Sequence, residues 1–144
     1  MSAVTTDSIR KTVLVDFAPA EAFELFTARI ASWWPVGSHS YAGDGVKDLV
    51  FEPHVGGRVY EVSDAGEQDW ARVREWEPPH GFLLDWLIGD AHGTEVEVRF
   101  SPEGPGARVV LEHRGWGPDG TPSHDRYTSG WDVVLAPFVE SAKS

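Results

Sequence analysis

The stretch that decides the fold is residues 130–142, which read GWDVVLAPFVESA near the end of the chain. Its apolar residues recur at helical spacing and share one face about 100° wide or more. They are Trp131, Val134, Leu135, Phe138, Val139 and Ala142. A helix with such a stripe must lie on an apolar surface, and most of the preceding chain is typical of strands. We therefore expect this helix to cross one face of an antiparallel sheet, with the functional site in the space between them.

The rest of the chain supplies the sheet. Apolar and polar residues alternate in segments bounded by glycine and proline, and this pattern predicts seven strands. Their ranges are 9–17, 49–53, 58–62, 69–77, 82–88, 94–100 and 108–116, with 102–106 as the last hairpin loop. After the first strand, Pro19 opens a helical stripe that Pro35 ends, which predicts two short helices. Residues 35–48 have three glycines and no apolar period, so we expect a mobile loop that can act as a lid.

These elements define an α+β protein with a sheet of about six to seven strands, two short helices and a long C-terminal helix that begins near Thr121. We expect one domain over residues 1–144, with an ordered core from about 9 to 142. The 144 residues carry 12 basic and 23 acidic side chains, for a net charge of −11. Such an acidic surface disfavours nucleic acid as a partner. The sequence has no apolar run long enough to cross a membrane, no secretory leader pattern and no cysteine, so a cytoplasmic protein is expected.

Several short motifs follow one another along this order of elements. They are AEAFELFT at 20–27, WWP at 33–35, FEPHVGGR at 51–58, DWARV at 69–73, WEPP at 76–79, TEV at 94–96, LEHRG at 111–115 and GW at 130–131. The motifs and their order resemble the START-like (SRPBCC, helix-grip) superfamily, and within it the chain is similar to homologues of the activator of the heat-shock protein 90 ATPase. One departure is Ala71, where such proteins usually have glycine, which predicts an altered bulge in that strand. The resemblance implies a sheet curved around the last helix and a cavity between them. Relatives bind lipids, sterols or polyketides there, some cyclise polyketides, and the namesake stimulates its chaperone by direct contact.

Aromatic and apolar side chains around this expected cavity are the candidate site. Seven tryptophans and seven phenylalanines suit either a large core or a pocket for a planar ligand. The predicted ligand-binding residues are Trp33, Tyr41, Phe51, Trp86, His113, Trp116, Tyr127, Trp131, Leu135 and Phe138. Plain packing is the competing interpretation for those on the last helix. Tyr41, with His39, belongs to the loop expected to close over a ligand, and Trp116 and Tyr127 flank the expected mouth.

His113 is the polar exception, because alternation places it on the apolar face with Val109 and Leu111. A buried histidine needs hydrogen-bond partners. Tyr60, Arg72 and Arg74 are candidates. His113 is then a satisfied core residue, a polar anchor for a ligand, or a general base.

The sequence offers no catalytic constellation. The six histidines lack metal-ligand spacing, and the Ser38-His39-Ser40 tripeptide lacks a nucleophile-elbow pattern. We therefore expect no metal, no cofactor and no catalytic residue. The first hypothesis is non-catalytic binding of an apolar or aromatic small molecule. The alternatives are a module that activates a chaperone ATPase, and a polyketide cyclase or aromatase in which His113 or Tyr127 moves protons. A homodimer or a chaperone is the possible protein partner.

Overall fold

The structure is a seven-stranded antiparallel sheet with two helices packed on one face. The computed structural model describes residues 8–116 and 121–143. The strands are β1 (Ile9–Val15), β2 (Asp48–Phe51), β3 (Arg58–Ser63), β4 (Gly66–Glu77), β5 (Gly81–Trp86), β6 (Glu95–Glu103) and β7 (Gly106–Arg114). The helices are α1 (Pro19–Phe26) and α2 (Thr121–Ser141), with short 3₁₀ turns η1 (Ile30–Ser32), η2 (Gly43–Gly45) and η3 (Gly89–Ala91). This α+β arrangement is the helix-grip fold that the sequence predicts.

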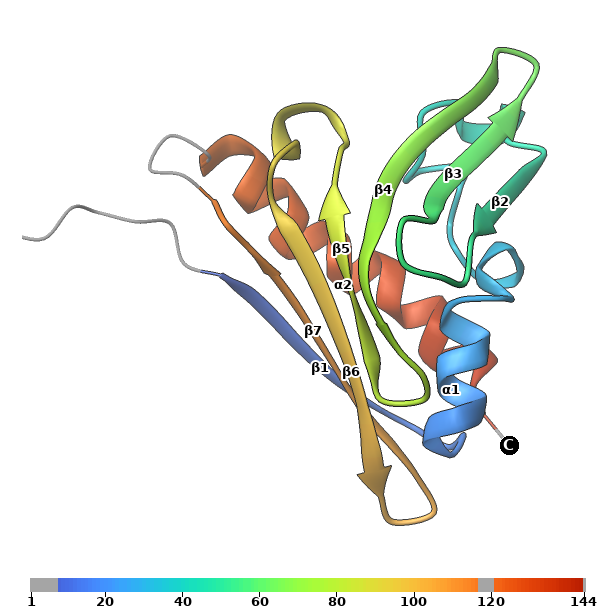
Figure 1. Cartoon of the computed structure of the whole chain (residues 1–144), viewed down its shortest axis with the longest axis vertical. Coiled ribbons are helices and arrows are strands. Elements are labelled where there is room, and N and C mark those ends of the chain that lie inside the picture. Colours follow the sequence, from blue (N-terminus) through green and yellow to red (C-terminus); the bar gives the residue numbers. More distant parts are fainter. Residues whose placement is uncertain (1–7, 117–120, 144) are drawn as a thin grey trace, which may run out of the picture.

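The sheet order is β1-β7-β6-β5-β4-β3-β2, so the first strand joins the last and leaves β2 at the other edge. Figure 1 shows α2 running obliquely across one face of this sheet, with α1 beside its C-terminal part. The rings of Phe26 in α1 and Phe138 in α2 lie 5.0 Å apart and join the two helices over the sheet. None of the helices in the described part of the chain is long and apolar enough to span a membrane.

The two faces of the sheet differ as the alternation predicts. Val96, Val98 and Phe100 of β6 are buried, and on the opposite face Arg114 contacts three carboxylates within 3.2 Å, those of Glu95, Glu97 and Glu112. The predicted helical stripe is buried at Trp131, Val134, Leu135, Phe138 and Ala142, while Val139 is only half-buried.

Several strand boundaries differ from the prediction by two or three residues, and the clearest cases are the last hairpin and the end of β1. β6 and β7 extend into the expected hairpin loop, where Pro102 pairs with Ala107, so the turn is shorter. β1 ends at Val15 rather than Phe17. At the end of β1, the backbones of β1 and β7 approach so closely that a Cβ on Gly106 would lie 1.9 Å from the Val15 carbonyl oxygen. Only glycine permits this contact.

β4 bends at a bulge beside Ala71. The register shifts so that Trp70 has no opposite residue between Val59–Ala71 and Tyr60–Asp69. An extra residue breaks the alternation, which explains why the consecutive residues Trp70 and Ala71 are both buried. A second shift at Arg74 separates the pairs Val73–Leu84 and Glu75–Leu83. Bulges increase strand twist and bending, and these two let the sheet curve towards α2.

Candidate ligand-binding pocket

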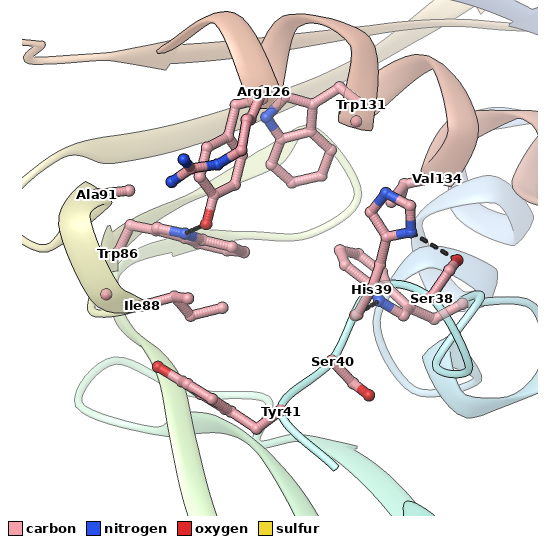
Figure 2. Close-up of a pocket in the computed structure, with 14 residues that line it drawn as sticks. Ser38, His39, Ser40, Tyr41, Trp86, Ile88, Ala91, Arg126, Trp131 and Val134 are labelled. Atoms are coloured by element: carbon pink, nitrogen blue, oxygen red, sulfur yellow. Dashed lines mark hydrogen bonds between the residues drawn. The ribbon is translucent and has the colours of Figure 1, made fainter. Parts of the chain in front are cut away.

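A pocket of about 380 Å³ lies at one end of the space between helix and sheet. Three segments that are far apart in sequence form its walls: the N-terminal half of α2, the β5–β6 connection around η3, and the segment from Trp34 to Tyr41 (Figure 2). The lining residues are Trp34, Ser38, His39, Ser40, Tyr41, Trp86, Ile88, Gly89, Ala91, Arg126, Tyr127, Gly130, Trp131 and Val134.

The remainder of the space under α2 is filled. A second cavity there measures only about 10 Å³, which is at the lower limit for a single water molecule. Phe26 explains the close packing, because its ring meets those of Phe82 and Phe138 within 5.6 Å. Ligand-sized space is therefore confined to the end of the helix near Tyr127 and Gly130.

The predicted site residues divide into three groups. Tyr41, Trp86, Tyr127 and Trp131 line the pocket. His113 and Trp116 are buried immediately behind it, since their rings lie 4.9 and 5.7 Å from that of Tyr127. The other four, Trp33, Phe51, Leu135 and Phe138, are core residues that do not line the pocket.

His113 is a satisfied core residue in this structure. Trp131 Nε1 donates to His113 Nδ1 at 3.1 Å, and His113 Nε2 lies 2.7 Å from Thr94 Oγ1. Since Nδ1 accepts, the neutral ring carries its proton on Nε2 and donates it to Thr94, whose hydroxyl donates to the Ala91 carbonyl at 2.6 Å. Burial, with a smaller contribution from the charge of His124, lowers the pKa of His113 to about 3. The ring thus stays neutral and links Trp131 of α2, through the Thr94 hydroxyl, to the Ala91 carbonyl in η3.

The candidate partners of His113 from the sequence were wrong. Arg72 is exposed, and Arg74 pairs with Asp85 and Glu95 on the outer face of the sheet. Tyr60 carries the Arg58 guanidinium over its ring at 3.8 Å. Thr94 and Trp131 take their place because β6 lies beside β7 and α2 crosses above both. With both ring nitrogens engaged and no atom on the pocket wall, His113 is not placed to move a proton to or from a ligand.

Tyr127 and Trp86 form a polar point in the aromatic wall. Trp86 Nε1 donates to the Tyr127 hydroxyl at 2.9 Å, the bond drawn beside Trp86 in Figure 2. Burial raises the pKa of Tyr127, although the bond from Trp86 acts in the opposite direction. The phenol therefore stays protonated at neutral pH.

The segment expected to be a mobile lid is instead hydrogen-bonded into place. Glu61 of β3 is fully buried, and its carboxylate accepts bonds from the backbone N–H of Tyr41 at 2.8 Å and of Ala42 at 2.9 Å. Trp70 Nε1 donates to the same carboxylate at 2.7 Å. At the start of the segment, Trp34 Nε1 donates to the His39 carbonyl at 2.8 Å. The segment therefore forms a fixed wall of the pocket. Glu61 lies in the same phase of β3 as the buried Val59, and this inward carboxylate was the available sequence signal.

His39 and Gly130 line the pocket, although neither is among the ligand-binding residues predicted from the sequence. His39 Nδ1 lies 2.7 Å from the Ser38 hydroxyl. Its Nε2 faces α2, at a distance of 3.7 Å from where a Cβ on Gly130 would lie. Nε2 has no hydrogen bond to any residue within the described ranges. An imidazole nitrogen is therefore open at the pocket wall, opposite the side formed by Trp86 and Ile88 (Figure 2).

Comparison with known proteins agrees with this architecture. The family model described as "activator of Hsp90 ATPase homolog 1-like protein" matches residues 16–142. No curated protein matches the chain significantly.

Several solved structures share the fold over nearly the whole chain. An anthrahydroquino-γ-pyrone synthase, Txn09, is 34% identical, with a TM-score of 0.62 and coverage of 94% of this chain and 97% of that one. The self-sacrificing resistance protein CalC from Micromonospora echinospora is 25% identical, with a TM-score of 0.73 and coverage of 94% and 93%. The Aha1 dimer from Colwellia psychrerythraea is 15% identical, with a TM-score of 0.74 and coverage of 96% and 97%, a likeness of fold alone.

Proposed function

Because the chain belongs to the family of proteins similar to the activator of Hsp90 ATPase homologue 1, and a fold does not by itself determine a function, we propose its function from the residues that line the pocket. We propose that the protein binds a planar aromatic small molecule between α2, η3 and the segment 34–41. The observation that carries the proposal is a pocket of about 380 Å³ that is lined by five aromatic side chains in addition to His39. Tyr41 lies at the rim, and the other four are Trp34, Trp86, Tyr127 and Trp131.

Size and wall chemistry together favour this ligand class. Pockets for small molecules measure roughly 300–1,000 Å³, so this one suits a few fused rings better than a sterol or a lipid. Indole and phenol rings offer flat faces for stacking and edges for T-shaped contacts. The polar groups are few and lie at separate points of the wall, which is the usual arrangement for fixing the orientation of an otherwise apolar ligand.

A relative supports the same class. Txn09, at 34% identity over nearly the full length of both chains, is named as an anthrahydroquino-γ-pyrone synthase, and such a pyrone is a fused aromatic compound. Binding of a fused aromatic molecule in the corresponding region of this chain is consistent with that name.

The experiment is calorimetric titration with naphthalene, a bare fused aromatic probe. Ile88 faces the pocket in Figure 2, so Ile88→Trp should fill the space and weaken binding at least tenfold. Val133 is 50% exposed on α2 outside the pocket, and Val133→Trp is the matched control that should bind as the wild type does. Failure of the wild type to bind naphthalene and its oxygenated derivatives alike, or equal affinity in Ile88→Trp, would overturn the proposal.

Catalysis of ring closure is the second candidate, favoured by the name of the 34% identical relative and by the open nitrogen of His39. Ser38 lies 3.4 Å from the Pro35 carbonyl, so its hydroxyl can donate there and accept from His39 Nδ1–H. Nε2 then carries the lone pair of a general base. In γ-pyrone closure, the phenol oxygen bonds to a ketone carbon, and its proton passes to His39, which returns it to the former ketone oxygen. The adjacent CH2 then loses a proton to form the ring C=C bond as that oxygen leaves, and the phenol proton and the CH2 proton account for the two hydrogens of the released water.

A model substrate tests this candidate. 1-(2-Hydroxyphenyl)butane-1,3-dione loses one water to form 2-methylchromone, and the protein should accelerate that conversion. His39→Ala should abolish the acceleration, whereas His54→Ala, at an exposed turn between β2 and β3, should not change it. An equal rate with and without the wild-type protein would eliminate the candidate.

Two protein partners are tested separately. The family description suggests contact with a chaperone, and the dimeric Aha1 neighbour suggests self-association. Stimulation of a purified Hsp90 ATPase tests the first, and the sedimentation coefficient of the free protein tests the second.

A further inference from the structure

Tyr127 is held in one orientation by the rings around it. His113, Trp116, Trp86 and Trp131 surround its ring with centroid distances between 4.9 and 6.2 Å. The Trp86 ring is nearly perpendicular to it, at 86°. A side chain fixed by packing presents its polar atom without a further loss of rotamer entropy when a ligand arrives.

The hydroxyl of Tyr127 has a donor to spare. Its oxygen accepts from Trp86 Nε1, and Trp86 is only 3% exposed, so water does not compete for that bond. A phenol can donate one hydrogen bond as well as accept. No acceptor for the Tyr127 proton occurs among the residues that the structure describes. A hydroxyl on the wall of an apolar pocket is therefore left to donate to whatever occupies it.

The charge near this hydroxyl favours an electron-rich oxygen. Arg126 lines the same wall. Its positive charge favours the ionised form of Tyr127, so the guanidinium lies within electrostatic range of the phenol. A carbonyl or phenolate oxygen on the ligand would accept from Tyr127 and also experience this positive potential. A bare aromatic hydrocarbon would leave the donor unsatisfied.

We propose that Tyr127 selects, among planar aromatics, those that carry a ketone or phenolate oxygen at the ring edge, as hydroxyquinones do. The Tyr127 hydroxyl, oriented by Trp86, donates to that oxygen while Trp131 and Trp86 contact the ring system. This specificity rests on the proposed binding of aromatic molecules and names their chemical class.

The experiment compares two probes on the same ring frame, naphthalene and 2-hydroxy-1,4-naphthoquinone, which is an anion at neutral pH. The absence of cysteine removes thiol addition to the quinone as a complication. The wild type should bind the hydroxyquinone at least tenfold more tightly. Tyr127→Phe should lose on the order of tenfold in affinity for the hydroxyquinone, as expected for a hydrogen bond to a charged group, and keep its affinity for naphthalene. Tyr60→Phe, on the opposite face of the sheet, is the matched control and should change neither affinity.

Loss of the Tyr127 hydroxyl also leaves the buried Trp86 N–H without an acceptor, so an independent readout uses the unaltered protein. The chain has only three tyrosines, and labelling them with ¹³C at Cζ gives three resonances that Tyr41→Phe and Tyr60→Phe assign. The Tyr127 resonance should shift with the hydroxyquinone far more than with naphthalene. Equal shifts, or equal loss of both affinities in Tyr127→Phe, would overturn the proposal. If naphthalene binds and the hydroxyquinone does not, the specificity is refuted alone. If neither binds, the proposed function fails and the specificity fails with it.

Discussion

Acid should destabilise this protein through His113 well above the pH at which carboxylates titrate. The pKa of His113 is about 3 in the folded protein because burial penalises the charged ring, whereas in the unfolded chain it is about 6.5. Below pH 6.5 the unfolded state therefore takes up a proton that the native state does not. The contribution of His113 to the free energy of unfolding is therefore fully present above pH 6.5 and decreases as the pH falls towards 3.

The magnitude follows from the two pKa values. Each pH unit inside this window costs about 1.4 kcal/mol for one group, and integration from pH 8 to pH 5 lowers the free energy of unfolding by about 2 kcal/mol. That is a large share of the roughly 5–15 kcal/mol by which domains are stable. Glu97, whose pKa is lowered in the folded state, loses its contribution only as the pH falls further, so measurement above pH 5 leaves that contribution intact.

Urea unfolding at a series of pH values, followed by tryptophan fluorescence, measures the effect. His113→Asn removes the titrating ring while keeping an acceptor for Trp131, and its stability should change less between pH 8 and 5 than that of the wild type. Should the variant not fold, the ring resonances of His113 in the wild type give the same answer. Titration of those resonances with a pKa near 6 would refute the reasoning, because it would mean that the charged ring is tolerated in its site.

Two further predictions concern the walls of the pocket. Gly130 lies within α2, and a Cβ there meets His39 Nε2 at an ordinary contact distance of 3.7 Å. Gly130→Ala should therefore raise the free energy of unfolding by about 0.5–1 kcal/mol through helix propensity, which calorimetric melting measures. Gly130→Leu should weaken naphthalene binding, which calorimetric titration measures. Unchanged binding in the leucine variant would contradict the placement of Gly130 in the pocket wall. Glu61→Gln offers one acceptor fewer to three N–H donors, so it should cost about 1–3 kcal/mol and speed amide exchange at Tyr41 and Ala42. Equal protection of these two amides in both proteins would show that Glu61 does not hold the segment.

The sequence predicted the architecture because that information is local. The helical spacing of Trp131, Val134, Leu135 and Phe138 is enough to predict which face of α2 is buried. Strand alternation is enough to predict that His113 points inward. The partners of His113 could not be found in the same way. Thr94 and Trp131 reach it only because β6 lies beside β7 and α2 crosses both, and a residue pattern contains neither the strand order nor the crossing point.

The position of the pocket depends on side-chain size where distant segments meet. Large rings face one another over most of the space under α2, as Phe26, Phe82 and Phe138 do, and they fill it. At the other end the facing positions are small: Gly130 on α2, Ala91 in the β5–β6 connection, and Ser38 and Ser40 on the loop wall. A single sequence marks each of these as small without showing that they oppose one another. The small residues leave the space that forms the cavity, and His113 and Glu61 hold two of its walls in place through hydrogen bonds. Substitutions at Gly130 or Ser40 should therefore change the size of ligand that the pocket accepts. The filled core under Phe138 should stay intact in these variants.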